Sequence, residues 1–246
     1  MSTRSGSRVA LVTGGSGGIG QSVVERLATD GFAVAVHYAG NKLKADALVE
    51  KVTASGGHAI AVGGDVADEN AMTAAFDAVE QAFGGVDVVV NAAGIMILST
   101  IIDLDLADLD RMHRTNIRGS FVIAQQAAKR VRSGGAIINF STSQTRLQHP
   151  TYAPYAASKA AVEGMTLILA RELRGKDITV NTVAPGPTAT ALFLEGKDQA
   201  TIDRLAGLAP LERLGTPEDI AETVAHLAGP ARWVNGQTIF PNGGIA

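Results

Sequence analysis

A tyrosine and a lysine four positions apart are the residues of this sequence with the clearest capacity for chemistry. Tyr155 and Lys159 lie in an alanine-rich stretch, and a helix there would place both side chains on one face, about one turn apart. A free phenol has a pKa near 10, and a neighbouring cation favours the phenolate. Lowering that pKa to about 7 would need roughly 4 kcal/mol. The pair predicts a general acid–base unit for interconverting a carbonyl and an alcohol.

A glycine-rich turn near the N-terminus predicts a dinucleotide site. The apolar run VALVT leads directly into Gly14, Gly15, Ser16, Gly17, Gly18, Ile19 and Gly20. Glycines permit a tight turn and a close approach by a pyrophosphate, and the helix that follows offers free N–H groups at its positive end. Because the turn joins the first strand to the first helix of a βαβ pattern, it is a much stronger signal than a glycine string alone.

The end of the second predicted strand indicates which dinucleotide is bound. NAD sites usually carry an acidic residue there, on the ribose hydroxyls. Here the stretch from His37 to Lys42 contains no acid. Asn41 and Lys42 could instead hydrogen-bond or pair with a 2′-phosphate, which a carboxylate would repel. The sequence therefore predicts NADP(H) rather than NAD(H).

The elements that must position these residues alternate along the chain. Strands are predicted at Arg8–Val12, Ala33–His37, His58–Val62, Val86–Val90, Ala136–Phe140, Thr179–Val183 and Gln237–Phe240. Helices are predicted at Gly18–Asp30, Lys42–Ser55, Glu69–Phe83, as a pair over Leu106–Arg132, and at Tyr152–Arg174 and Pro217–Leu227. β-branched runs that alternate with alanine-rich stretches are typical of buried parallel strands and their crossover helices. We therefore predict one α/β domain over residues 1–246, a Rossmann-type doubly wound parallel sheet of about seven strands flanked by helices.

One segment interrupts this alternation. Between Pro185 and Pro217 no strand is predicted, and two prolines around Gly186 open the stretch. Such a segment beside a sheet is often a mobile lid over a ligand site. We predict a substrate lid over about residues 187–212; a surface excursion without function is the alternative.

Composition excludes several classes of protein. The 246 residues include no cysteine, which excludes disulfide scaffolds, Cys-ligated metals and thiol nucleophiles. A net charge of −3 argues against nucleic acid as the main partner. No run of about 20 apolar residues is present to span a membrane, and the N-terminal MSTRSGSR lacks the apolar core of a signal peptide. The five histidines show no metal-ligand spacing. We expect a cytoplasmic globular protein without a metal.

Together these motifs resemble the short-chain dehydrogenase/reductase family over almost the whole chain. The resemblance rests on Thr13–Gly20, Asn91–Gly94, Asn116, the Tyr155–Lys159 pair, Pro185-Gly186 with Thr190, and Asn242–Gly244. Within the family, the chain looks most like 3-oxoacyl-(acyl-carrier-protein) reductases, whose relatives reduce many other ketones. The resemblance implies a carbonyl or alcohol substrate and a homotetramer, or a dimer, built through the helices of Leu106–Arg132 and Tyr152–Arg174.

The resemblance also assigns roles to individual residues. Tyr155 would be the general acid in reduction, Lys159 would lower its pKa and hold the nicotinamide ribose, and Asn116 would anchor a water that relays protons. Asp65 and Val66 would lie against the adenine. With the glycine turn and the second strand, the predicted cofactor residues are Gly14, Ser16, Gly17, Gly18, Ile19, Gly20, Tyr38, Asn41, Asp65, Val66, Asn91, Ala92, Gly94, Tyr155, Lys159, Pro185, Gly186, Thr188 and Thr190.

The catalytic hydroxyl is where the sequence departs from the family pattern. Relatives usually carry a serine 13 residues before the tyrosine, and Thr142 occupies that position here. Threonine also offers a hydroxyl donor. A loop one residue shorter between Gln144 and Thr151 would instead place Ser143 in the role. We predict Ser143 as the catalytic hydroxyl, with Thr142 as the alternative.

Two other functions compete with an NADP(H)-dependent carbonyl reductase. An NAD-dependent alcohol dehydrogenase would use the same residues in the opposite direction. A dinucleotide-binding sensor without turnover would keep the fold alone. The presence of Tyr155, Lys159 and Asn116 together argues against the sensor, because a protein without turnover has no need of all three.

Overall fold

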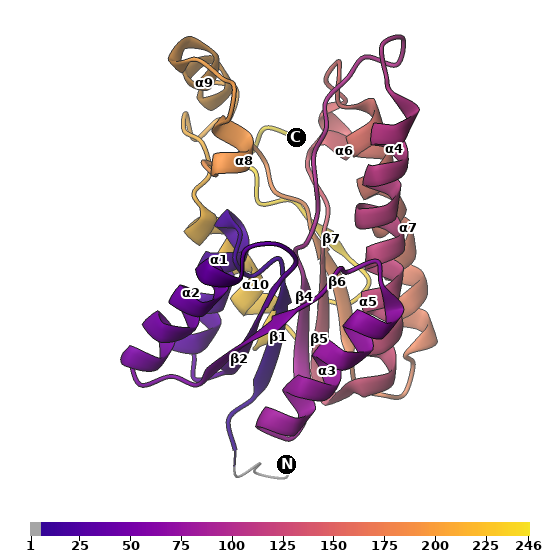
Figure 1. Ribbon diagram of the computed structural model, residues 1–246. Helices are drawn as coiled ribbons and strands as arrows, with labels where there is room; N and C mark the ends of the chain where they lie inside the picture. Colours follow the sequence, from indigo (N-terminus) through magenta and orange to yellow (C-terminus); the bar gives the residue numbers. More distant parts are fainter. Residues whose placement is uncertain (1–5) are drawn as a thin grey trace.

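The computed structural model describes residues 6–246. Within them, seven strands form one parallel sheet in the order β3-β2-β1-β4-β5-β6-β7 (Figure 1). The strands are β1 (Val9–Thr13), β2 (Ala33–Tyr38), β3 (Ala59–Gly63), β4 (Val86–Asn91), β5 (Val131–Phe140), β6 (Thr179–Val183) and β7 (Thr238–Ile239). The order reverses direction at β1, so the predicted doubly wound α/β fold is confirmed.

Helices cover both faces of the sheet. One face carries α1 (Gly18–Thr29), α2 (Lys42–Ala54) and α10 (Pro217–Ala228). The other carries α3 (Glu69–Phe83), α5 (Gly119–Arg130) and α7 (Ala153–Glu172). Side chains alternate along each strand, so Val34 and Val36 pack against the first layer while Ala33 and Ala35 pack against the second. Because both faces are buried, apolar side chains from the strands pack into both layers, and polar strand residues such as Asn91, Asn139 and Thr182 are buried as well.

Shorter helices lie around the carboxyl edge of the sheet. They are α4 (Leu106–Met112), α6 (Gln144–Leu147), α8 (Ala191–Leu194) and α9 (Gln199–Ala206). The last two fall within the predicted lid and rise above the edge at the upper left of Figure 1. Whether this segment acts as a lid, and whether the domain takes in residues 1–5, which lie outside the described residues, remain predictions. No helix within residues 6–246 is both long and apolar enough to cross a bilayer.

Two predicted elements differ from the observed ones. β5 begins at Val131 rather than Ala136. Gly134 and Gly135 separate Val131 from the apolar run that starts at Ala136, so the sequence pattern did not reveal this start. The pairing with β4 shifts register between Val86 and Val88. The predicted helix pair over Leu106–Arg132 is one helical run whose middle, His113–Arg118, is a π-helix. A π turn holds one more residue than an α turn, which an apolar repeat does not reveal.

A histidine buried at the end of β2 makes stability depend on pH. His37 is 1% exposed, and burial lowers its pKa to about 4 from a usual value near 6.5. Between these values the unfolded chain binds the proton and the folded chain does not, so stability falls as the pH falls from 6.5 toward 4. We expect this histidine alone to remove about 2–3 kcal/mol of unfolding free energy between pH 7.5 and 4.5.

Urea unfolding at the two pH values checks this expectation. The protein should lose about 2–3 kcal/mol more than the His37→Asn variant does, because other titrating groups are common to both. His58→Asn is the matched control, since that histidine is solvent-exposed. An equal loss in the protein and in His37→Asn would contradict the prediction.

Candidate active site

A cavity of about 160 Å³ lies at the carboxyl edge of the sheet, where β4, β5 and β6 end. Of the predicted site residues, it is lined by Ile19, Ala92, Gly94, Ser143, Tyr155, Lys159, Pro185, Gly186, Thr188 and Thr190. Segments more than 150 residues apart in the chain meet here, since parallel strands bring their carboxyl ends to one edge. The predicted acid–base pair and part of the predicted cofactor set therefore share one cavity.

Tyr155 is held protonated by its surroundings. It lies in the first half of α7, and burial raises the pKa of Tyr155 to about 12, while a hydrogen bond with the Thr142 side chain opposes that rise. The Lys159 ammonium lies 6.0 Å from the centre of the phenol ring, and the expectation that it lowers the pKa of Tyr155 stays a prediction. At neutral pH the phenol is thus available as a proton donor.

Lys159 lies one turn after Tyr155 on the same helix, as its spacing predicted. It is 5% exposed, and its Nζ donates to the carbonyl of Phe140 at 3.0 Å. Burial lowers the pKa of Lys159 to about 8, because a charged ammonium is costly among apolar groups. Its proton is therefore held less tightly than that of a surface lysine.

The hydroxyl beside Tyr155 belongs to Thr142, not to Ser143. The Thr142 side chain lies where it lowers the pKa of the phenol, and its Oγ1 accepts from Gln144 N–H at 3.3 Å. Ser143 Oγ donates to the carbonyl of Ala184 at 3.0 Å and lies 3.3 Å from Asn242 Nδ2. Successive side chains after β5 point in different directions, so one step along the chain moves the hydroxyl away from the phenol. The geometry favours the alternative, Thr142, and the choice between the two hydroxyls stays a prediction.

Asn116 lies behind the cavity rather than in its wall. It is fully buried within the π-helical segment, and its amide accepts from Ile95 N–H and donates to Ile95 C=O, both at 2.9 Å. A third bond, also 2.9 Å, reaches Ser158 Oγ. A Cβ on Gly94 would lie 3.2 Å from Asn116 Oδ1 and 3.1 Å from Lys159 Nζ, so any side chain there would crowd both groups. Asn116 therefore fixes the segment after β4, and a water anchored there remains a prediction.

The glycine turn fits a pyrophosphate. Gly14 has a φ of +65°, and a Cβ on Gly20 would meet the Gly14 carbonyl oxygen at 2.2 Å, so only glycine allows α1 to begin this close to β1. Gly17 precedes α1, whose first N–H groups receive no side-chain cap. Free N–H groups at a helix N-terminus bind anions. Ser16 and Gly18 are the remaining members of this turn, and Gly18 faces the Thr190 side chain.

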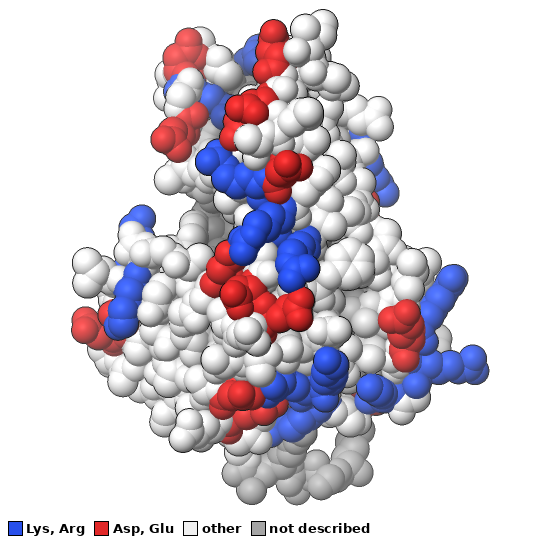
Figure 2. All heavy atoms as spheres, turned by 45° about the vertical axis from the view of Figure 1, so that its right-hand side comes forward, with Lys and Arg blue, Asp and Glu red and all other residues white. Residues whose placement is uncertain are grey.

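Three further predicted cofactor residues, Asn91 and the adenine-side Val66 and Asp65, are engaged within the protein. Asn91 is buried and bonds Thr13, Ser120 and Asn139. Val66 is buried against Gly119. The Asp65 carboxylate accepts from Ala67 N–H and pairs with Arg114, a residue that no sequence motif had singled out. Figure 2 shows basic and acidic side chains side by side on one face of the molecule. The ion pairs of α4 and the π-helical segment include Arg111–Asp108, Arg114–Asp65 and Arg118–Glu69.

The residues predicted to recognise a 2′-phosphate lie at the start of α2. Asn41 Oδ1 caps this helix by accepting from Lys44 N–H at 3.0 Å. Lys42 pairs with Asp46 one turn later, at 2.7 Å. Tyr38 packs on Gly63, where a Cβ would meet the phenol oxygen at 2.9 Å. Asn41 and Lys42 are solvent-exposed beside the end of β2, although each is already engaged within α2.

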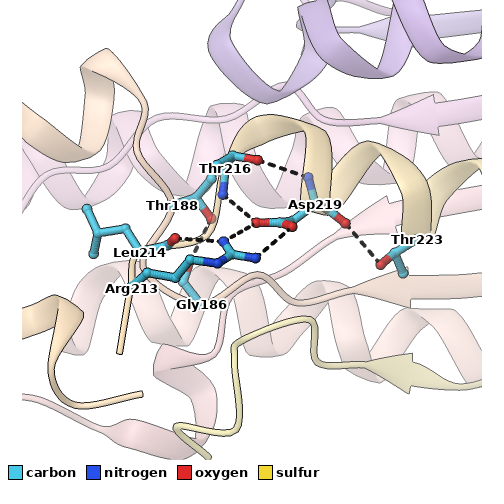
Figure 3. A network of polar contacts seen from close by, with 7 residues as sticks. All are labelled: Gly186, Thr188, Arg213, Leu214, Thr216, Asp219 and Thr223. Atoms are coloured by element: carbon cyan, nitrogen blue, oxygen red, sulfur yellow. Dashed lines mark hydrogen bonds and ion pairs between the residues drawn. The ribbon is translucent and has the colours of Figure 1, made fainter. Parts of the chain in front are cut away.

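Hydrogen bonds tie both ends of the predicted lid to the base of the cavity. Gly215 bridges to Thr188, accepting from Ala189 N–H at 2.8 Å and donating to Pro187 C=O at 2.9 Å. Figure 3 shows the Arg213 guanidinium bound to the Asp219 carboxylate at the start of α10. Nη1 donates to Oδ2 at 2.5 Å and Nη2 donates to Oδ1 at 3.0 Å. This guanidinium holds the pKa of Asp219 at about 2. Both ends of the segment between Thr190 and Glu212 are therefore held in place by hydrogen bonds.

Sequence reasoning missed much of the apolar wall. The cavity is also lined by Ile95, Met96, Gln144, Leu147, Tyr152, Leu192 and Phe193. Of these, only Leu192 and Phe193 lie in the predicted lid. These side chains belong to loops and short helices, whose apolar residues follow no repeat. Among the described residues that line the cavity, Lys159 is the charged one.

Comparisons with known proteins give a consistent result. Residues 14–246 match the family model described as Enoyl-(Acyl carrier protein) reductase. The chain is 40% identical to an NADPH-dependent aldehyde reductase-like protein, chloroplastic, of Arabidopsis thaliana, over 96% of this chain and 93% of the relative. It is also 40% identical to a 3-oxoacyl-(acyl-carrier-protein) reductase of Staphylococcus aureus, over 97% and 98%. A short-chain dehydrogenase from Burkholderia cenocepacia, solved in complex with NADP, superposes with a TM-score of 0.91 at 39% identity, over 99% of both chains.

Proposed function

Because the chain belongs to the short-chain dehydrogenase/reductase family, we propose that it is an NADP(H)-dependent reductase of a ketone or 3-oxoacyl group. The observation that carries the proposal is the meeting of Tyr155, Thr142 and Lys159 at one cavity. NADP(H), when bound, supplies or accepts the hydride. The choice of NADP(H) is supported by the NADP complex of the Burkholderia protein and by the NADPH-dependent Arabidopsis relative.

Residues of the chain donate the proton, orient the carbonyl oxygen and bind the cofactor. Tyr155, protonated at neutral pH, gives its proton to the carbonyl oxygen as the carbon is reduced. The Thr142 hydroxyl donates a hydrogen bond to the same oxygen and holds it against the phenol. The Lys159 ammonium holds the nicotinamide ribose and favours the phenolate left after proton transfer. The first turn of α1 and the glycines before it hold the pyrophosphate.

The lining of the cavity indicates the kind of carbonyl compound. Ile95, Met96, Leu147, Leu192 and Phe193 surround the reacting groups with apolar surface. A carboxylate or phosphate beside the carbonyl would lose its hydration here and find Lys159 as its only charged partner among the described lining residues. We therefore expect a substrate that is uncharged near its carbonyl.

One assay tests the proposal. Oxidation of NADPH, with NADH in parallel, is followed by absorbance across a panel of aldehydes, ketones and a 3-oxoacyl thioester. Turnover that prefers NADPH is the expected result. Turnover that prefers NADH would overturn the cofactor assignment and favour the NAD-dependent dehydrogenase. Tight NADPH binding without turnover of any carbonyl would overturn the enzyme assignment.

Assembly and location are further parts of the proposal. Phe121 on α5 and Leu167 and Ile168 on α7 are exposed apolar side chains, with Phe121 and Ile168 more than half accessible. They support the predicted homotetramer or dimer, because association would bury them. The cytoplasmic location stays a prediction, since the name of the Arabidopsis relative includes the word chloroplastic.

A further inference from the structure

A carboxylate that the proposed chemistry does not use lies directly behind the reacting hydroxyl. Glu163 is on α7, one turn after Lys159, and is partly buried. Its Oε1 accepts from Ser141 Oγ at 2.5 Å and from Thr145 Oγ1 at 2.9 Å. Lys159 directs its ammonium to the carbonyl of Phe140. Glu163 is thus bound to two hydroxyls of the segment that carries Thr142.

These two contacts bracket Thr142 in the chain. Ser141 immediately precedes it, and Thr145 follows three residues later at the start of α6. Thr145 Oγ1 also lies 3.0 Å from the Thr142 carbonyl oxygen, so its one proton is shared between that carbonyl and the Glu163 carboxylate. Hydrogen bonds to an ionised carboxylate are shorter and stronger than those between neutral groups. One side chain of α7 therefore fixes the backbone on both sides of Thr142.

The contact with Ser141 has a second consequence. Ser141, Thr142 and Ser143 are three consecutive hydroxyl residues that line the cavity. Glu163 engages the first, and the Ala184 carbonyl engages the third. The Thr142 oxygen accepts from Gln144 N–H at 3.3 Å, which leaves its proton to be directed at Tyr155 or a substrate. Glu163 thus helps to determine which of the three hydroxyls can reach a substrate.

We propose that Glu163 is a positioning residue for carbonyl reduction: by holding Ser141 and Thr145, it aims the Thr142 hydroxyl at Tyr155. This inference rests on the proposed function. It predicts that Glu163 acts through Thr142 and through no other group of the site.

The test is a double-mutant cycle. We expect Glu163→Ala to lower kcat by about 10- to 100-fold, as misplaced catalytic groups do, with NADPH binding by fluorescence titration nearly unchanged. Glu163→Gln should recover part of this loss, because its amide oxygen can still accept. Adding Glu163→Ala to Thr142→Ala should cost little more than Thr142→Ala alone. Glu172→Ala, an exposed carboxylate on the same helix, is the matched control.

Several results would overturn the proposal. A Glu163→Ala variant with full kcat would do so. So would fold-losses of kcat that multiply when Glu163→Ala is combined with Thr142→Ala, because they would show that Glu163 acts independently of Thr142. If Glu163→Ala does not fold, the Ser141→Ala/Thr145→Ala variant removes the same contacts without leaving a cavity behind α7, and it must show the same loss of kcat and the same lack of additivity.

A measurement without turnover separates this inference from the proposed function. Hydrogen exchange should become faster in the peptide that covers residues 140–148 when Glu163 is replaced by alanine, less so when it is replaced by glutamine, and should stay unchanged in β1 and α10. Unchanged exchange in residues 140–148 would overturn the positioning role even if no carbonyl substrate is found. Faster exchange together with an absence of turnover would mean that the proposed function, not the contact, is wrong.

Discussion

Tyr155→Phe is expected to lower kcat/KM for carbonyl reduction by about 10²- to 10⁴-fold, the range that general acid–base catalysis contributes. Phenylalanine keeps the ring in the cavity and removes the hydroxyl, which carries the proton that the carbonyl oxygen must receive. The phenol is protonated at neutral pH, because burial raises its pKa to about 12. The loss should therefore appear in kcat, while NADPH titrated by fluorescence binds nearly as before.

Tyr152→Phe provides the comparison, because its phenol lines the same cavity three residues earlier. Its effect should be far smaller, since Tyr152 does not bond Thr142. A Tyr155→Phe variant that keeps a tenth of the activity or more would exclude Tyr155 as the proton donor. Comparable losses in both variants would mean that the cavity needs its phenols for shape.

Thr142→Ala is expected to produce the second largest loss, about 10²- to 10³-fold in kcat, the effect of removing one donor from a developing oxyanion. Thr142→Ser should restore most of the activity, because it returns a hydroxyl to the same Cβ. Ser143→Ala should change kcat little. It should instead lower the unfolding free energy by about 1–2 kcal/mol, because the Ala184 carbonyl loses its donor.

Initial rates and urea unfolding of the three variants decide between the two hydroxyls. A large kcat defect in Ser143→Ala with an active Thr142→Ala would reverse the assignment made from the structure. Equal defects in both would indicate that the segment tolerates no change, and the hydrogen exchange of residues 140–148 would then show whether its order has been lost.

Much of the fold could be predicted because its signals are local. Buried strands such as β2 and β6 read as short β-branched runs, and amphipathic helices such as α3 fill the intervals between them. Parallel strands then require crossover helices, which leave few topologies. The glycine turn was predictable for the same reason, since the steric demand that Gly20 meets lies within one turn of chain.

Elements whose limits depend on neighbours were harder to predict. The start of β5 at Val131 is defined by its pairing with Val86 of β4. The glycines that follow Val131 give no strand signal of their own. The π-helical turn contains Asn116, whose amide contacts Ile95, 21 residues away in the chain. No repeat in the local sequence records such a contact.

The sequence by itself determined the fold class, the position of the glycine turn and the Tyr155–Lys159 pair, because each depends on spacing along one or two elements. Only the tertiary structure decided that Thr142 rather than Ser143 faces the phenol, that the pKa of Tyr155 is raised, and that Glu163 lies behind the reacting segment. The physical reason is the same in each case. Direction and burial of a side chain are set by contacts between β5, α7 and the end of β6, which are remote in the chain and adjacent only in the folded protein.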